Sequence, residues 1–354
     1  MNTIVIDTGT KASGDRLAPD RQPAAPAPDS SPDSAAQCLA RVPALRVLER
    51  GWLSANSIVF LDGNRLADDH LADSQPTLPG AVVVDTGYVS DAAQTVSLLR
   101  DTLNGRLLSA ILNTHLHSDH CGGNAAVQAA WHCPILIPPG EADAVAAWDA
   151  GALSYDATGQ ECPRFAYDAL LTPGDTLRLG GTNWDVHAAP GHDPHSIMLF
   201  APEHRLLISA DALWENGLGI IFPELLGRPG FGAAKEALDR IESLAPDCVI
   251  PGHGPAFVDV PQAIARARAR LAGFEANPDR HAMYALKVLV QFLLLDQRTL
   301  SLAQIETLLG SADYLVQLNQ RYLRQTVPML ARQACEALAK SGVAVFDGTG
   351  LRLP

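Results

Sequence analysis

The chain has 354 residues, of which 47% are hydrophobic, so it is long enough to bury a full core and is expected to hold one large domain and a smaller one. Its formal net charge of −13 disfavours broad binding to nucleic acid or to an anionic membrane through the whole surface. The sequence has no run of about 18 apolar residues and no basic, apolar start of the signal-peptide type, so we expect a cytoplasmic protein.

The first 40 residues, 1–40, are predicted to form a disordered or loosely attached tail. Residues 8–37 are rich in Pro, Ala, Ser and Asp. A segment of this composition cannot bury enough apolar surface to offset the entropy that is lost on ordering. The pattern changes at Val42, and we place the first domain over residues 41–260.

Strands and helices are predicted to alternate in the first half of this domain. The expected elements are strands over 45–48, 57–61, 81–87, 107–112 and 134–137, and helices over 91–103 and near 141–149. Such a succession favours layers of sheet and helix. An irregular stretch to about residue 170 follows, and its aromatic residues, from Trp148 to Tyr167, are expected to pack in a core or a lid rather than to line a pocket.

Three histidines and an aspartate lie within six positions directly after the strand predicted over 107–112. They are His115, His117, Asp119 and His120. We expect them on a loop at the C-terminal edge of a sheet, where open α/β sheets place their chemistry. Imidazole and carboxylate groups together suit zinc, manganese or iron. A solvated loop seldom needs these four side chains so close together, so we interpret the cluster as a metal site.

Three later strand ends carry further candidate ligands. His192 follows the alternating strands predicted over 177–179 and 184–187, Asp211 ends an apolar run from Leu206, and His253 follows a strand over 247–250. Taken singly, His192 and His253 would read as ordinary loop histidines. They become candidates because they follow the first cluster in the order found in the metal-binding family that these motifs resemble.

This ordered set resembles the His-x-His-x-Asp-His signature and the three later ligands of the metallo-β-lactamase superfamily, in particular its glyoxalase II and lactonase-like branch. The resemblance implies an α/β (α+β) fold, a four-layer αββα sandwich. It also implies two divalent metal ions, zinc by preference, with manganese or iron left open. The implied ligands are His115, His117 and His192 for the first metal, Asp119, His120 and His253 for the second, and Asp211 between them.

The resemblance also assigns a reaction, the attack of a metal-bridging hydroxide on an activated carbonyl. Asp119 is then the catalytic residue, because its free oxygen would orient the hydroxide. Trp214 stands where relatives that hydrolyse acyl-homoserine lactones carry a tyrosine that aids the leaving group, and an indole cannot donate a proton in the same way. Ala210 stands where the family often has glycine, which changes the packing beside Asp211 but keeps the carboxylate.

Several neighbours of the ligands have two interpretations. Asp85 fits the family's Asp-x-Gly strand end, and either supports the metal loop by hydrogen bonds or merely ends the strand. Cys121 is expected to fill a turn rather than to bind metal, and His195 to bond a neighbouring loop rather than substrate. The segment 214–224 either leans over the metals or connects a strand to a helix predicted over 233–244.

All six cysteines lack a CxxC partner and read as reduced thiols.

Residues 261–354 are predicted to form a small, mostly helical domain. The expected elements are helices over 260–275, 280–296, 301–309 and 316–341, then two short strands within 343–353 around an Asp-Gly turn. This set resembles the winged-helix-like domain that follows the hydrolase domain in some superfamily members. Its arginines are too widely spread for a DNA-reading helix, so we expect it to pack and to close the pocket.

The prediction is therefore a dinuclear hydrolase of thioesters, esters or lactones with a small-molecule substrate. A metal-dependent phosphodiesterase or ribonuclease remains an alternative, since relatives with a similar C-terminal domain act on RNA. An iron-dependent oxidoreductase or a non-catalytic binding protein are alternatives of another class, although diiron flavoprotein relatives place glutamate where His117 stands. Nucleic acid and membrane partners are disfavoured, and a homodimer is left open.

Overall fold

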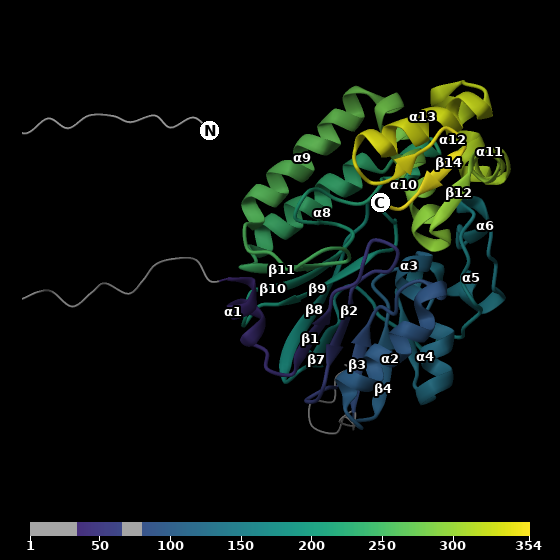
Figure 1. Ribbon diagram of the computed structural model, residues 1–354. Helices are drawn as coiled ribbons and strands as arrows, with labels where there is room; N and C mark the ends of the chain where they lie inside the picture. The colour runs from purple at the N-terminus through teal and green to yellow at the C-terminus, as the bar shows by residue number, and fades with distance from the viewer. Residues whose placement is uncertain (1–33, 66–79) are drawn as a thin grey trace, which may run out of the picture. The chain divides into compact units, whose positions relative to one another are not determined.

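Two β-sheets lie face to face at the centre of the computed structural model, which describes residues 34–65 and 80–354 (Figure 1). The first sheet has the order β1-β2-β3-β4-β5-β6, with β1 Leu45–Leu48, β2 Ser57–Phe60, β3 Ala81–Val84, β4 Leu108–Leu112, β5 Ile135–Ile137 and β6 Ala169–Leu170. The second has the order β11-β10-β9-β8-β7, with β7 Thr176–Leu179, β8 Thr182–Ala188, β9 Ile197–Ala201, β10 Leu206–Ala210 and β11 Cys248–Pro251.

The core between the sheets follows from the two-residue period of the strands. Val82 and Val84 of β3 point into a cluster that also holds Trp184 and Ile208 from the second sheet. Val83, between those two valines, points to the opposite face. Both faces of β3 are therefore buried, which explains why its sequence is a continuous apolar run rather than an alternating one.

Helices cover the outer face of each sheet. On the first sheet lie α2 Ala92–Leu103 and α4 Asn124–Trp131, whose residues share a cluster with Val83 and Ile111. On the second sheet lie α8 Phe231–Leu244 and α9 Val260–Ala276, whose residues share a cluster with Leu207 and Val249. The predicted four-layer αββα sandwich is thereby confirmed (Figure 1).

Short helices lie in the loops of the sandwich. They are η1 Val89–Asp91, α3 Ser118–Cys121, η2 Pro139–Glu141, α5 Ala142–Ala147, α6 Tyr155–Thr158 and α7 Phe222–Leu225. The aromatic residues Trp148, Tyr155 and Phe165 pack in the cluster on the outer face of the first sheet, as expected of core residues.

The C-terminal region combines helices with a third, three-stranded sheet. Its elements are α10 Pro278–Gln297, β12 Thr299–Ser301, α11 Leu302–Ser311, α12 Asp313–Leu318, the π-helix η3 Asn319–Leu323, α13 Val327–Lys340, β13 Val345–Phe346 and β14 Gly350–Arg352. The predicted final strands pair antiparallel around the Asp-Gly turn. The strand β12, which was not predicted, completes the sheet in the order β12-β14-β13. The division at residue 261 and the winged-helix-like architecture stay predictions.

The helix predicted over 316–341 is wrong, because the chain breaks between η3 and α13. Arg324 has a left-handed backbone with φ 52°, and Thr326 precedes the first turn of α13 in an extended conformation. Pro328 explains the break, since a proline ring inside a continuous helix would clash with the carbonyl of residue 324. At the second position of α13 its missing N–H is harmless.

The end of the predicted tail also differs from the prediction. Residues 1–33 lie outside the described residues, but Ala35–Ala40 form the helix α1. Ser34 caps it, since its Oγ accepts from the backbone N–H of Gln37 while the Gln37 side chain accepts from that of Ser34. Cys38 is buried against the inter-sheet core. Within the part of the chain that the structure describes, no helix is long and apolar enough to span a membrane.

Candidate metal centre

The seven predicted ligands all follow the C-terminal ends of strands. Four come from the loop after β4 and from α3, and the others from the segments after β8, β10 and β11. The structure brings all of them into three overlapping groups, and within each group the ligand atoms lie within 4.8 Å of one another. The groups are His115, His117 and His192; His115, His120 and Asp211; and Asp119, His120 and His253.

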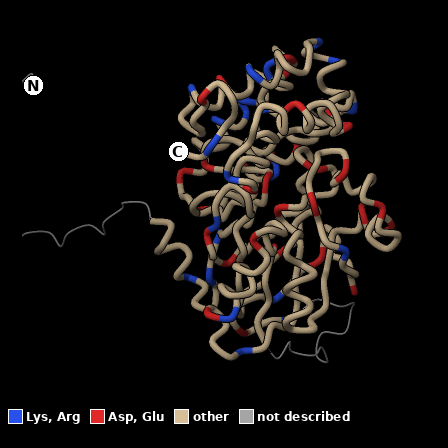
Figure 2. The backbone as a smooth tube through the Cα atoms, turned by 45° about the vertical axis from the view of Figure 1, so that its right-hand side comes forward, with Lys and Arg blue, Asp and Glu red and all other residues tan. Residues whose placement is uncertain are grey.

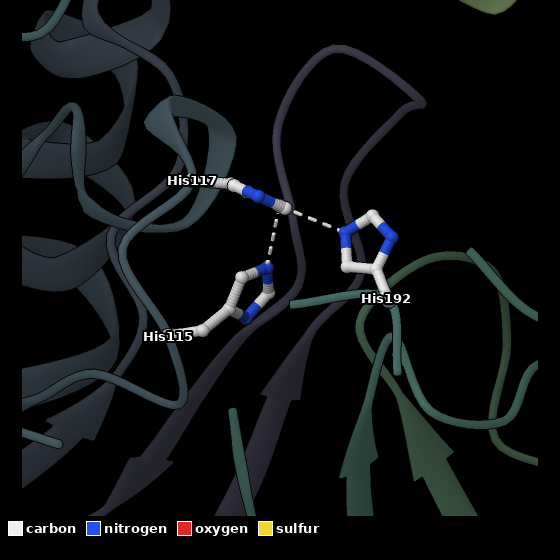
Figure 3. Close-up of side chains that lie close together, drawn as sticks. All are labelled: His115, His117 and His192. Carbon is white, nitrogen blue, oxygen red and sulfur yellow. Dashed lines mark hydrogen bonds between the residues drawn. The ribbon is translucent and has the colours of Figure 1, made fainter. Parts of the chain in front are cut away.

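Three imidazoles of the first group point their ring nitrogens at one another (Figure 3). Nδ1 of His117 lies 3.2 Å from Nε2 of His115 and 2.8 Å from Nε2 of His192. Burial lowers the pKa of His117 and of His192 to about 4, and it lowers that of His115 well below the ordinary value. All three rings are therefore neutral near pH 7, which is the state in which imidazole binds a metal.

Asp119, His120 and His253 form the other side of the centre. Nε2 of His253 lies 3.1 Å from Oδ2 of Asp119. Burial alone would lower the pKa of His120, but Asp85, Asp211 and Asp119 surround it and raise the pKa above its ordinary value. Burial alone would raise the pKa of Asp119 and of Asp211, but His120 and His253 hold both pKa values below the ordinary value.

Asp211 lies between the two sides. Its Oδ2 is 3.4 Å from Nε2 of His192, and its Oδ1 is 3.5 Å from Nε2 of His120. The indole N–H of Trp214 donates to Oδ1 at 3.1 Å. A Cβ added at Gly252 would lie 2.2 Å from this Oδ1, so the chain can carry only glycine there without displacing Asp211.

Asp85 connects the end of β3 to the ligand loop. Its Oδ2 lies 2.8 Å from Nδ1 of His120, and its two oxygens accept from the backbone N–H and the hydroxyl of Thr114. The interpretation of Asp85 as a support of the metal loop, rather than a mere strand end, agrees with these contacts. Nδ1 of His192 is fixed in a similar way, 2.6 Å from the carbonyl oxygen of Ile220.

Two other neighbours of the ligands lie outside the groups. The Sγ of buried Cys121 contacts the carbonyl oxygens of Leu116 and His117, as expected of a small residue that fills a turn. The ring of exposed His195 lies against Gly140 of a neighbouring loop, since a Cβ at that glycine would be 2.0 Å from the ring nitrogen Nδ1.

A cavity of about 360 Å³ opens onto the candidate ligands. The segment 214–224 leans over it, because Trp214, Ile220 and Phe222 line the cavity and the ring of Phe222 lies 5.2 Å from that of His117. This agrees with the first of the two interpretations of that segment.

Sequence reasoning missed several lining residues. Trp52, from the loop between β1 and β2, stacks on His253 with ring centroids 5.4 Å apart. The helices α9 and α10 add Arg270, Tyr284 and Phe292. The pocket-closing role predicted for the C-terminal helices agrees with these positions, but no local motif marks the individual residues, because their partners lie far away in the sequence.

The comparisons with known proteins agree with this geometry. The family model of the metallo-beta-lactamase superfamily matches residues 80–253, which include all seven candidate ligands. A hydroxyacylglutathione hydrolase from Bdellovibrio bacteriovorus is 31% identical over 48% of this chain and 56% of its own length. One from Methylobacterium sp. (strain 4-46) is 29% identical over 75% of this chain and 86% of its own length.

Coverage of these relatives is partial. The chain spans about half the length of the curated relatives that it matches first, between 38% and 56%.

A solved structure of a metallo-beta-lactamase family protein from Thermus thermophilus has a TM-score of 0.50 and 17% identity, and the match covers 88% of this chain and 99% of that one. This likeness bears on the fold alone. The chain therefore carries a metallo-beta-lactamase superfamily domain, and the convergent histidines and aspartates lie within it.

Proposed function

We propose that the protein is a hydrolase that binds two divalent cations, zinc by preference, and cleaves an activated carbonyl compound, in the first place a thioester. The observation that carries the proposal is the position of Asp211. One carboxylate faces His192 with one oxygen and His120 with the other, at 3.4 and 3.5 Å. A carboxylate shared by two groups of ligands is suited to hold two cations close together.

The donor set fits such cations. Nε2 of His120 is completely buried and has no hydrogen-bond partner among the described residues, since 3.5 Å to Asp211 is too long for a good bond. An orphaned nitrogen of this kind is costly in a protein interior unless a further group, such as a metal, uses its lone pair. Its other nitrogen, Nδ1, contacts Asp85, the arrangement found where a carboxylate orients a metal-binding histidine.

The chemistry can then be divided between the cations and the chain. When bound, two divalent cations supply Lewis acidity and lower the pKa of water enough to give a hydroxide nucleophile near neutral pH. His115, His117 and His192 would hold one of them and Asp119, His120 and His253 the other, with Asp211 shared. Asp119, which also lines the cavity, would orient the nucleophile through its free oxygen.

A thioester is favoured over an ester or lactone because of the leaving group. The indole N–H of Trp214 already donates to Asp211, and an indole does not release its proton as an acid. A thiol has an ordinary pKa of about 8.5, so a thiolate leaves without a proton donor, whereas an alkoxide needs one. The similarity to proteins named hydroxyacylglutathione hydrolases supports the same choice.

The phosphodiesterase alternative has no comparable support. In the view of Figure 2, Lys and Arg positions are interspersed with Asp and Glu positions along the described chain and form no continuous basic band. Nucleic-acid binding would favour such a band.

The test measures the bound metal and the hydrolytic turnover of the same protein preparations. Protein purified without added metal and protein loaded with zinc, manganese or iron would be analysed for bound metal and assayed on thioesters, lactones and a phosphodiester. We expect about two cations per chain and thioester turnover in the wild type, and loss of turnover in Asp119→Ala. Asp143→Ala, which changes an exposed aspartate of α5, is the matched control. A wild type and an Asp119→Ala variant that are equally inert on every ester class would contradict the proposal.

A further inference from the structure

Two cysteine thiols contact one another beside the candidate metal centre. Sγ of Cys121 lies 3.8 Å from Sγ of Cys162. Cys121 ends the short helix α3, which also carries Asp119 and His120, whereas Cys162 belongs to an irregular segment after α6. All six cysteines of the chain are free. The pair is therefore a cluster of nucleophilic side chains that the proposed hydrolysis does not use.

The irregular segment is held against α3 on both sides of this contact. The hydroxyl of Ser118 donates to Oε1 of Gln160 at 2.5 Å. The backbone N–H of Glu161 donates to the hydroxyl of Tyr88 at 3.1 Å. Ser118 lies three positions before Cys121, so both side chains are on the face of α3 that meets this segment. The proximity of the two sulfurs thus follows from the docking of several residues rather than from one side chain.

The two thiols differ in their access to solvent. Cys121 is 0% exposed, whereas Cys162 is partly exposed. Cys162 also lies two positions after Gln160, which lines the cavity. A small oxidant therefore reaches Cys162 first. The hydrogen bond between the two sulfurs lowers the pKa of Cys162, which favours the thiolate, the form that reacts with oxidants.

Cys121 connects this pair to the ligand loop. Its Sγ lies 3.4 Å from the carbonyl oxygen of Leu116 and 3.3 Å from that of His117. The hydroxyl of Tyr155 donates to the same Leu116 carbonyl at 2.9 Å and lies 3.3 Å from this Sγ. An S–S bond of about 2.05 Å requires the two sulfurs to approach by roughly 1.8 Å, and it removes the S–H. The backbone beside His117 would then lose a hydrogen-bond donor.

We propose that Cys162 and Cys121 form a disulfide in response to a hydroperoxide, and that this disulfide weakens metal binding at the candidate centre. The Cys162 thiolate attacks the peroxide, so that an S–O bond forms and the O–O bond breaks. The leaving hydroxide or alkoxide takes up the proton that the thiol has released. The thiol of Cys121 then attacks the sulfenic acid on Cys162, the S–S bond forms, and the hydroxyl group leaves with the thiol proton as water. The peroxide is reduced and the two thiols are oxidised.

A second pair of cysteines provides an internal control. Cys248 of β11 contacts Cys38 of α1 at the inter-sheet core. Both are buried, with exposed fractions of 0% and 1%, so a peroxide in the solvent does not reach either thiol. Contact between two sulfurs is thus common to both pairs, whereas exposure of one sulfur belongs to the pair of Cys121 and Cys162.

The first test maps the disulfide. Protein is treated briefly with hydrogen peroxide, the peroxide is removed with catalase, and the remaining thiols are alkylated before peptide mass spectrometry. We expect the wild type to link Cys121 to Cys162 and to leave Cys38 and Cys248 reduced. Cys162→Ser should form no disulfide, and Cys121→Ala should stop at a sulfenic acid on Cys162 that dimedone labels. Cys133→Ala, which removes another buried thiol, should behave like the wild type.

Two results of this mapping would overturn the inference. One is a wild type in which oxidised Cys162 carries no bond to Cys121. The other is oxidation of Cys38 and Cys248 to the same extent, which would show that exposure does not select the pair.

The second test measures zinc binding by the reduced and the oxidised protein, in competition with a coloured chelator. This part of the inference rests on the proposed metal-binding function, whereas the oxidation does not. We expect the disulfide to raise the Kd for zinc by about tenfold to a hundredfold, the usual effect of losing a contact beside the ligands. A thiol reductant, removed before the titration, should restore the affinity. Cys162→Ser should keep its affinity after peroxide, which separates the disulfide from oxidation of the ligands themselves.

The outcomes distinguish this inference from the hydrolase proposal. Equal zinc affinity of reduced and oxidised wild type would overturn the link between the thiol pair and the centre. If neither form binds zinc, the metal-binding proposal fails, while a mapped bond between Cys121 and Cys162 still supports the oxidation site.

Discussion

Single atoms decide the geometry of the candidate centre, as the contact between Gly252 and Asp211 illustrates. We expect Gly252→Ala to push the Asp211 carboxylate away from its place between His192 and His120, because the new methyl group would lie 2.2 Å from Oδ1. The variant should lose most of its bound metal and about 1–3 kcal/mol of unfolding free energy. Metal analysis and urea unfolding of the same protein would measure both effects.

A matched glycine is available as a control. A Cβ at Gly232 in α8 meets no atom within 4 Å. Gly232→Ala should therefore leave the metal content as it is and raise the unfolding free energy by at most about 1 kcal/mol, because alanine favours helix. Similar metal content in the two variants would show that Asp211 tolerates the displacement.

At the scale of the element, the packing of α10 on α9 depends on a buried histidine. His281 is 1% exposed, and its ring stacks on Phe274 of α9 with centroids 4.4 Å apart. Burial lowers the pKa of His281 to about 4, and no carboxylate of the described residues offsets this effect. The helix contact therefore holds a neutral imidazole in an apolar environment.

The consequence is a loss of stability in acid. The unfolded chain takes up this proton near pH 6.5, whereas the folded chain does so near pH 4, so the unfolded state binds more protons between these values. His281 therefore leaves the unfolding free energy unchanged above pH 6.5 and lowers it as the pH falls from 6.5 towards 4. At pH 5 the loss is about 2 kcal/mol. His281→Leu should lose less stability than the wild type between pH 7.5 and pH 5 in urea unfolding. Equal losses in both proteins would contradict the assignment.

Elements also show where sequence reasoning succeeds and fails. The strand before His115 and the cluster that follows it are local signals, whereas the sandwich and the full set of seven ligands could be predicted only through the resemblance of the ordered motifs to a known family. The break between η3 and α13 was missed although Pro328 marked it, because the apolar period continues on both sides. Arg270 and Trp52 could not be predicted as lining residues, since only the docking of α9 and of the β1–β2 loop brings them to the cavity.

For the whole molecule, the candidate centre joins the two sheets. His115, His117, Asp119 and His120 follow β4 of the first sheet, and the remaining candidates follow strands of the second. A cation held by both sets would link the sheets and stabilise the folded state. We expect chelation to lower the melting temperature, and zinc to restore about 2.7 kcal/mol per cation when the free metal reaches a hundred times its Kd.

Differential scanning calorimetry with and without a chelator would measure this link. Asp211→Ala should recover less stability than the wild type on addition of zinc, because the shared carboxylate is gone. An unchanged melting temperature in protein that demonstrably binds zinc would argue against a link between the sheets.

The spacing of the ligands along the chain also has a consequence for biosynthesis. His253 emerges from the ribosome 138 positions after His115, which at ordinary rates of translation corresponds to about 7 to 28 seconds. The nascent chain can hold the first histidines during this interval but not a complete coordination sphere. The helix α10, which walls the cavity, is translated later still. Metal capture at full affinity therefore cannot begin before His253 has emerged, which is late in the synthesis of the chain.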